Sequence, residues 1–206
     1  MVDYANPVVY RISAADVIED VNDAWARFAI DNDASPLATE VVGKPLWDYI
    51  SGGAVKRIYE SILKCVRTRN RTVSFPFRCD SPSMCRGMRL FVVPLGQERI
   101  EFRAVSETAF LQPKPLDLLN PGRARDTQTH LYMCSWCKAV AIGTEWKPIE
   151  TAMEELRLFA RTALPSIKHV ICDSCLAAFL EDFMPEDESL ADDMQAYITF
   201  SNRWLR

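Results

Sequence analysis

The chain has 206 residues, of which 49% are apolar and 25% are charged, and its formal net charge is -4. This composition is ordinary for a soluble globular protein with one large or two small domains. The acidic balance argues against non-specific binding to nucleic acid or an anionic membrane, which needs a basic surface. No apolar run approaches the ~20 residues of a membrane span, and the first residues do not form a signal peptide, so we expect a cytoplasmic protein.

The cysteine content points to a function other than disulfide bonding. The chain has seven cysteines, and an odd number in a reducing compartment does not suit a disulfide framework. Some of these thiols are therefore expected to serve another purpose.

The first part of the chain predicts two strands followed by helices. Apolar residues alternate within residues 8–22, which indicates two strands with a tight connection. Asn22 is suited to cap a helix over residues 24–30, because its side-chain oxygen can accept a hydrogen bond from a free backbone N–H. Residues 44–50 predict a short helical turn, and apolar spacing predicts a full helix over residues 54–69.

After this helix the apolar pattern changes to the period of a strand. Residues 73–79 alternate strictly between apolar and polar types, and residues 80–83 have the composition of a turn. Two more strands are predicted over residues 85–95 and 99–110. The predicted order is thus two strands, several short helices, one longer helix and three strands.

A change in composition predicts two domains. Residues 112–128 hold three prolines, one glycine and few aromatic residues, which indicates a linker. It separates a domain over residues 1–111 from a module over residues 129–206. In that module, apolar stripes at helical spacing, one of them from Ile149 to Leu164, predict a mainly helical structure, including a final helix over residues 190–205.

Two CxxC pairs stand out in the second module, Cys134-Ser-Trp-Cys137 and Cys172-Asp-Ser-Cys175. A two-residue spacer lets both sulfurs of a pair reach one ion at about 2.3 Å, and two pairs complete a tetrahedron of thiolates. The sequence therefore predicts a structural zinc ion bound by these four residues. A catalytic zinc is disfavoured, because four protein thiolates leave no position for water.

Other interpretations of the two pairs stay open at this point. Buried free thiols, redox-active CxxC motifs and an iron–sulfur cluster use the same residue type. His169 or His130 lies close enough in sequence to replace one sulfur. Lys138, Lys168 and backbone N–H groups are candidates to offset the negative charge of four thiolates.

The residues around the pairs resemble a short segment at the C-terminal end of some bacterial response regulators and sensor kinases. That segment reads CSxCK, then a tryptophan and a glutamate, then SHGICPDC. The counterparts here are CSWCK at 134–138, Glu145-Trp146 with Ile149-Glu150, and KHVICDSCL at 168–176. Val170 stands in place of the glycine and Asp173-Ser174 in place of Pro-Asp. The resemblance covers about residues 133–177 and implies a metal-binding module of signalling proteins.

The predicted element order of residues 1–111 resembles a PAS domain, as do YRISAADVIEDVNDAWARFA and VVGKPLWDYI. The resemblance implies an α+β fold with a five-stranded antiparallel sheet and helices on one face, which senses a small ligand or a partner. It assigns no particular ligand. Candidate residues around a PAS cavity, each of a kind that more often serves simple core packing than ligand contact, are Trp25, Phe28, Trp47, Tyr49, Ile58, Ile62, Phe75, Phe77 and Leu90.

No catalytic motif is present: the sequence lacks GxSxG, P-loop, GxGxxG and HExxH patterns. A haem PAS domain is disfavoured because both histidines lie outside residues 1–111, and no flavin-binding cysteine context is found. Cys79 and Cys85 flank a predicted turn and are candidates for a reversible disulfide.

The sequence therefore favours a bacterial signalling sensor or adaptor that is not an enzyme. The PAS-like domain would bind a protein partner or a second copy, and zinc would brace the second module. Two alternatives remain: a transcription-associated nucleic-acid binder that uses the zinc module, and a thiol-based redox switch. The acidic second half disfavours the first of these.

Overall fold

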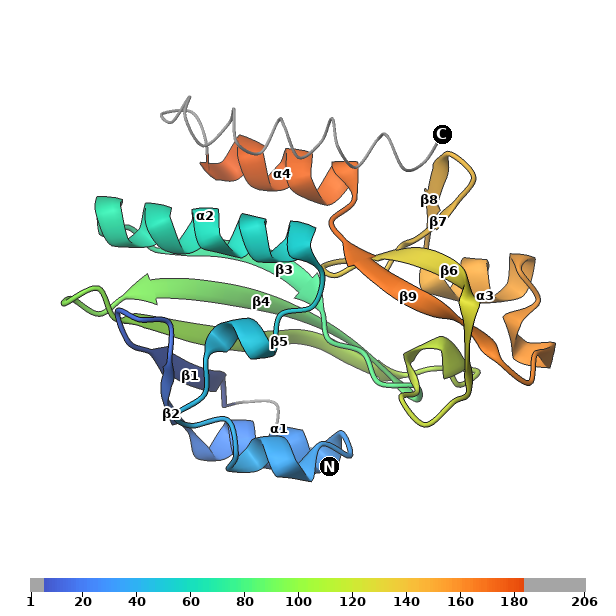
Figure 1. Cartoon of the computed structure of the whole chain (residues 1–206), viewed down its shortest axis with the longest axis horizontal. Coiled ribbons are helices and arrows are strands. Elements are labelled where there is room, and N and C mark those ends of the chain that lie inside the picture. Colours follow the sequence, from blue (N-terminus) through green and yellow to red (C-terminus); the bar gives the residue numbers. More distant parts are fainter. Residues whose placement is uncertain (1–5, 184–206) are drawn as a thin grey trace. The chain divides into compact units, whose positions relative to one another are not determined.

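The computed structural model describes residues 6–183, which form two compact units (Figure 1). Strands β3 (Val73–Arg78), β4 (Met84–Pro94) and β5 (Ile100–Leu111) each have residues in both units. The first unit comprises the described residues of Met1–Ser51 together with Lys56–Phe77 and Gly87–Thr108, and the second comprises Gly52–Val55, Arg78–Arg86 and the described residues of Ala109–Arg206.

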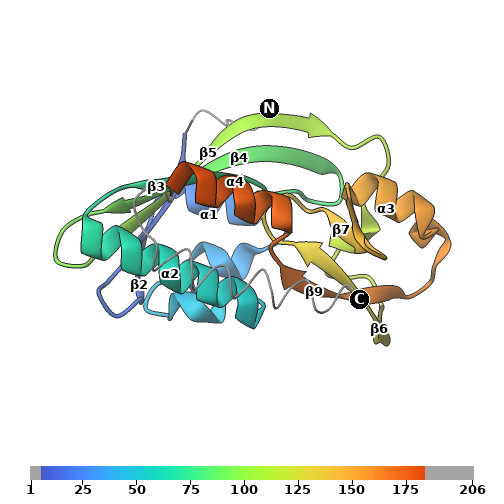
Figure 2. The same cartoon turned by 90° about the horizontal axis from the view of Figure 1, so that it is seen from above.

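The first unit is built on a five-stranded antiparallel sheet with the order β2-β1-β5-β4-β3. Its two long strands, β4 and β5, run side by side (Figure 2). The predicted strands are thereby confirmed. Their bounds are β1 Val8–Ile12, β2 Ile18–Val21, β3 Val73–Arg78, β4 Met84–Pro94 and β5 Ile100–Leu111.

The helices of this part of the chain follow the predicted order. Asn22 caps α1 as expected, because its Oδ1 accepts a hydrogen bond of 2.9 Å from the backbone N–H of Trp25. The same oxygen accepts one from Val9 at 3.1 Å, so this side chain also ties the helix to β1. The helices are α1 Asp23–Asp31, the 3-10 turns η1 Ser35–Ala38 and η2 Leu46–Asp48, and α2 Gly53–Arg69.

The turn between β1 and β2 is held through Asp16, whose backbone is left-handed with φ of 58°. Aspartate tolerates this conformation better than most residues. The indole N–H of Trp47 donates to one carboxylate oxygen of Asp16 at 3.0 Å, and Arg67 of α2 donates to the other at 2.6 Å. Three segments distant in sequence are thus joined at one side chain.

The core of the first unit combines aliphatic and aromatic packing. The Tyr10 ring stacks on Phe102 with centroids 4.5 Å apart, and Trp25 meets Tyr10 edge-on at 5.3 Å. Ile58 and Ile62 of α2 are each 1% exposed. The helical apolar pattern of residues 54–69 therefore marks the buried face of α2 correctly.

The second unit contains a four-stranded sheet with the order β8-β7-β6-β9. The prediction of a mainly helical module is wrong. The apolar stripe that runs to Leu164 indicated one long helix, but α3 ends at Glu155 and Arg157 has a left-handed φ of 52°. The elements are β6 Arg125–Cys134, β7 Val140–Ile142, β8 Glu145–Lys147, α3 Ile149–Glu155, η4 Leu158–Ala160, β9 Leu164–Val170 and α4 Asp173–Phe183.

The segment 112–128, predicted as a linker, takes part in the core of the second unit. Leu116 directly precedes the 3-10 turn η3 Asp117–Leu119, and Leu118 belongs to it. The two residues are 2% and 0% exposed, respectively. Strand β6 also begins within this segment, at Arg125. Leu116 and Leu118 pack in one buried cluster with Met133, Val140, Ile149, Ala152, Met153, Leu158 and Leu164.

The final helix predicted over residues 190–205 lies outside the described residues. Among the helices of residues 6–183, none has the length and the apolar character that crossing a bilayer requires.

A buried carboxylate on β5 is held by two arginines. Glu101, whose side chain is 6% exposed, accepts hydrogen bonds from Arg11 at 2.9 Å and from Arg103 at 2.5 Å. Burial alone would raise the pKa of Glu101, but the hydrogen bonds from Arg103 and Arg11 outweigh it, so the pKa is lowered.

We predict that Glu101→Gln destabilises the first unit at neutral pH and much less in acid. The native pKa of Glu101 lies below its unfolded value of about 4.3, so its contribution is present above that pH and lost as the pH falls through the native value. Urea unfolding at pH 7 should show a loss of about 2 kcal/mol. The control is Glu107→Gln, since Glu107 is 44% exposed beside Arg89. Equal losses at pH 7 and pH 3 would contradict this account.

Candidate metal centre

The parallel pairing of β6 and β9 brings the two CxxC pairs to the same edge of the sheet. These strands lie side by side (Figure 1), with Cys134 opposite Val170 in the register. Cys134 is the last residue of β6, and Cys172 follows the end of β9 by two residues. Because parallel strands end at the same edge of a sheet, residues distant in sequence meet there.

The first pair forms the turn that joins β6 to β7. The backbone N–H of Cys134 donates to Ala139 at 2.8 Å, and that of Lys138 donates to the carbonyl of Cys134 at 3.0 Å. Lys138 closes the turn with a left-handed φ of 63°. The backbone N–H of Cys137 points to the Cys134 sulfur, with 3.5 Å between nitrogen and sulfur. The turn thus presents both sulfurs on one side.

The second pair lies between β9 and α4. The N–H of Cys172 also donates to the Cys134 sulfur, at 3.4 Å. Cys175 lies in the first turn of α4, and the N–H of Leu176 donates to the Cys172 carbonyl at 3.0 Å. A hydrogen bond of 2.7 Å from the N–H of Ser135 to the Val170 carbonyl fixes the two pairs relative to each other.

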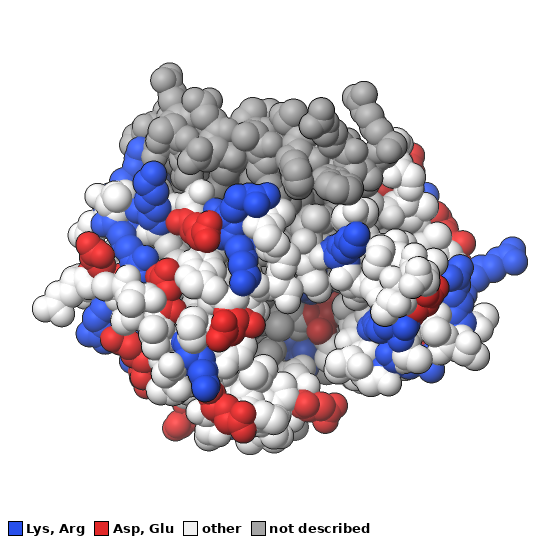
Figure 3. Space-filling model, in the orientation of Figure 1, with Lys and Arg blue, Asp and Glu red and all other residues white. Residues whose placement is uncertain are grey.

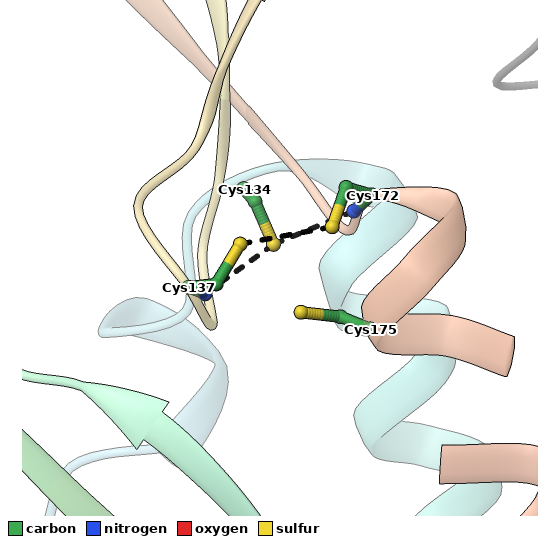
Figure 4. Close-up of side chains that lie close together, drawn as sticks. All are labelled: Cys134, Cys137, Cys172 and Cys175. Atoms are coloured by element: carbon green, nitrogen blue, oxygen red, sulfur yellow. Dashed lines mark hydrogen bonds between the residues drawn. The ribbon is translucent and has the colours of Figure 1, made fainter. Parts of the chain in front are cut away.

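The four sulfurs converge on one point, as Figure 4 shows. All four Sγ atoms lie within 4.8 Å of one another, and those of Cys137 and Cys172 are 3.7 Å apart. A tetrahedron of sulfurs at 2.3 Å from a zinc ion has edges of about 3.8 Å. All four thiols are free, and 3.7 Å is far longer than a disulfide bond of about 2.05 Å. The spacing therefore fits coordination of one metal ion.

The four thiols shift one another's pKa values. The pKa of Cys134 is lowered because its sulfur accepts hydrogen bonds from Cys137, Cys172 and Cys175. The pKa values of Cys172 and Cys175 are raised, chiefly by the hydrogen bonds that they donate to Cys134. Without a cation the group keeps protons on some of its sulfurs. A divalent ion is what allows all four to be thiolates together.

An aromatic pair encloses the site. Trp136, between the cysteines of the first pair, is 3% exposed, and its ring lies 5.4 Å from that of Phe179 on α4. Cys134 and Cys172 are buried, while Cys137 and Cys175 are half-buried. The packing of the loop against the helix limits access of water to two of the four sulfurs.

The two histidines are not among the converging ligands. His130 is exposed on β6, and His169 is half-buried on β9 opposite Met133. The pKa of His169 is lowered, first by burial and then by the charge of Lys138, which favours the neutral ring. Lys138 donates from Nζ to the Ser135 carbonyl at 2.9 Å, and the ammonium of Lys168 lies 5.8 Å from the centre of the Tyr132 ring.

The residues predicted around a PAS cavity are divided between the core and the surface, and their role in ligand binding stays a prediction. Trp25 and Trp47 have structural partners, since their indole N–H groups donate to the Leu37 carbonyl at 2.8 Å and to Asp16 at 3.0 Å. Ile58, Ile62, Phe75 and Leu90 are buried, Trp25, Phe28, Trp47 and Phe77 are half-buried, and Tyr49 is exposed.

Cys79 and Cys85 lie on either side of the β3–β4 turn. The N–H of Cys79 donates to the Arg86 carbonyl at 3.0 Å. Burial raises the pKa of both thiols, so neither has the thiolate character of a reactive cysteine. The disulfide considered from the sequence stays a prediction.

The structure brings together a second cluster of polar groups that the sequence did not predict. Single oxygens of Asp80 and Glu150 and the sulfur of Cys85 lie within 4.8 Å of one another. Arg78 lies with them, bonded to both carboxylates. These residues come from the β3–β4 hairpin and the start of α3, and no motif or spacing in the sequence connects them.

The comparisons with known proteins leave the chain unassigned: no protein-family model matches it, and no curated protein matches it. Support for a function therefore comes from the two sheets of the fold and from the convergence of the four sulfurs.

We predict that Cys134→Ser abolishes stoichiometric metal binding and destabilises the second unit more than the first. Serine keeps the volume but replaces the thiolate that lies at the centre of the hydrogen bonds. Structural zinc in small domains contributes on the order of 10 kcal/mol of binding. Elemental analysis measures the metal, and hydrogen exchange locates the loss of protection.

The matched control is Cys65→Ser, which changes a thiol of α2 outside the cluster. It should keep one metal per chain. Equal metal content in both variants, or equal loss of protection in both units, would contradict the assignment.

Proposed function

We propose that Cys134, Cys137, Cys172 and Cys175 hold one structural zinc ion. The observation that carries this proposal is the convergence of four sulfurs within 4.8 Å from two elements distant in sequence. Four thiolates suit a borderline-soft d¹⁰ ion and fill its tetrahedral shell. A filled shell leaves no position for water or substrate, so the ion would brace the loop, β9 and α4 rather than catalyse a reaction.

The backbone and the surroundings support a closed site. The two N–H groups that point to the Cys134 sulfur would reduce the negative charge of a tetrathiolate ion. These N–H groups belong to Cys137 and Cys172, which are themselves ligands, so these two residues help to orient Cys134. This arrangement favours a permanent ion over a transient one.

We further propose that the protein is a signalling sensor or adaptor whose first unit is a PAS-like module. The support is the five-stranded antiparallel sheet and the sequence of two strands, short helices, one long helix and three strands. Such a module would respond to a small ligand or a partner and relay the response by binding another protein or a second copy. The metal-braced unit would supply a rigid docking surface.

Charge distribution favours a protein partner over nucleic acid. The chain has a net charge of -4, and basic and acidic side chains are interspersed over the face drawn in Figure 3. Binding to a phosphate backbone depends on several Lys or Arg side chains grouped along one track. A transcription-associated role therefore has less support than an adaptor role.

Metal analysis of the full chain, purified without chelator, tests the structural ion. We expect one zinc per chain and no visible absorption. Iron in place of zinc would give charge-transfer bands in the visible range and would point to electron transfer instead. A chain with neither metal would refute the proposal.

A second experiment separates the adaptor from the nucleic-acid binder. Sedimentation of the zinc-loaded chain is measured alone and with duplex DNA, at low and high salt. We expect self-association or a monomer, and no DNA binding that weakens steeply with salt. A steep salt dependence would instead favour the nucleic-acid binder, because it reports release of counterions from phosphates.

A further inference from the structure

The end of strand β3 is hydrogen bonded to the first CxxC loop. Arg78 is the last residue of β3, and its backbone N–H donates to the carbonyl of Trp136 at 2.6 Å. Trp136 precedes Cys137 directly. The residues Val73–Phe77 before Arg78 belong to the sheet of the first unit, whereas Arg78–Arg86 belong to the second unit. Within the second unit, the last residue of β3 is therefore hydrogen bonded to the loop that carries two sulfurs.

The side chain of Arg78 is fixed between two carboxylates. Its Nη2 lies 2.5 Å from Oδ2 of Asp80 and 2.6 Å from Oε1 of Glu150. Glu150 belongs to the first turn of α3. The side chain of Asp80 is fully buried, and its other oxygen accepts from the N–H of Arg86 at 2.9 Å. Gln112 adds a contact to Glu150 at 3.4 Å.

The guanidinium of Arg78 is the cation of this network. The carboxylates of Asp80 and Glu150 converge with the Cys85 thiol as a metal site would require, but the guanidinium already supplies the cation between them. Burial tends to raise the pKa of Glu150, yet the hydrogen bond from Arg78 lowers it. The Glu150 carboxylate is therefore charged at neutral pH and helps to fix the position of Arg78.

We infer that Arg78 is a positioning residue for the metal centre, and that residues 78–86 of the β3–β4 hairpin are coupled to the bound ion. The inference rests on the proposed zinc site. The Asp80–Arg78–Glu150 bridge holds the backbone of Arg78 where its N–H meets the Trp136 carbonyl. A shift of β3 would strain this hydrogen bond and displace Cys137 from Cys172. In the reverse direction, loss of the ion frees the loop and loosens the hairpin.

The first test measures how fast zinc leaves the full chain in excess chromophoric chelator. Arg78→Met removes both ion pairs and keeps the apolar stem. Since partners outside the ligand shell commonly change metal affinity by about 10–100-fold, release should be at least about tenfold faster. Arg78→Lys keeps the charge but loses the contact of Nη1 with Glu150 at 3.5 Å and the planar fork of the guanidinium, so it should be intermediate. The control is Arg89→Met, which removes the exposed ion pair between Arg89 of β4 and Glu107 of β5. This variant should release zinc at the wild-type rate.

A double-mutant cycle tests the route through α3. Glu150→Gln should accelerate release on its own, and the double variant with Arg78→Met should be no faster than Arg78→Met alone. Glu150→Gln also keeps the test decisive if Arg78→Met fails to fold. Additive effects of the two substitutions would overturn the proposed bridge.

Hydrogen exchange tests the coupling itself. Removal of zinc from the wild-type chain should increase exchange at residues 78–86, with little change in β1 and β2. Unchanged exchange in the hairpin would overturn the inference, as would Arg78 variants that lower the melting temperature but release zinc at the wild-type rate. Either of these outcomes, obtained with a wild-type chain that contains zinc, would overturn the inference and leave the metal proposal intact. A wild-type chain without zinc would overturn both.

Discussion

The parallel pairing of β6 with β9 is the constraint on which the second unit depends. It places Cys134 opposite Val170 and so brings the Cys172 pair to the same edge of the sheet. A shift of the register by one residue would turn every side chain of β9 to the other face and separate the sulfurs. The bond from Ser135 to Val170 and the contact of Trp136 with Phe179 fix this arrangement beyond the strand pairing.

Polar side chains determine how the turns and strand ends are held. Asp16 joins a turn to a tryptophan and an arginine, Asn22 joins a helix to a strand, and Asp80 joins an arginine to a hairpin. Each is a short acid or amide with several hydrogen bonds at a break in regular structure. Buried groups of this kind are costly when one partner is lost, so they specify one arrangement of the backbone.

The sequence predicted the first unit well because its signals are local. Strand alternation, helical spacing and the Asn22 cap depend on neighbouring residues, and all correspond to observed elements. The cysteine pairs were identified for the same reason, since a two-residue spacer has a direct geometric meaning. The sulfur cluster confirms that these four residues converge, although their spacing says nothing about which strands bring them together.

The sequence patterns predicted the elements of the second unit poorly, for physical reasons. Residues 127–130 of β6 are exposed and polar, so the strand has little apolar alternation to reveal it. The stripe from Ile149 to Leu164 matches a helix, but its last apolar residues belong to η4 and β9. Leu116 and Leu118 lie in a proline-rich stretch, where composition suggests a linker although packing buries both side chains. The Arg78 bridge joins residues that only tertiary structure brings together.

The small size of the second unit's elements explains why a metal would matter there. Strands β7 and β8 have three residues each and α3 has seven, and elements this short are marginal without tertiary support. An ion shared by Cys137 and Cys172 would close the long loop between them and reduce the conformational entropy of the unfolded chain, as a disulfide does in an oxidising compartment. It would also hold α4 against the β6–β7 turn through Cys175. The metal would thereby add a second point of support to the buried cluster that includes Met133 and Ile149.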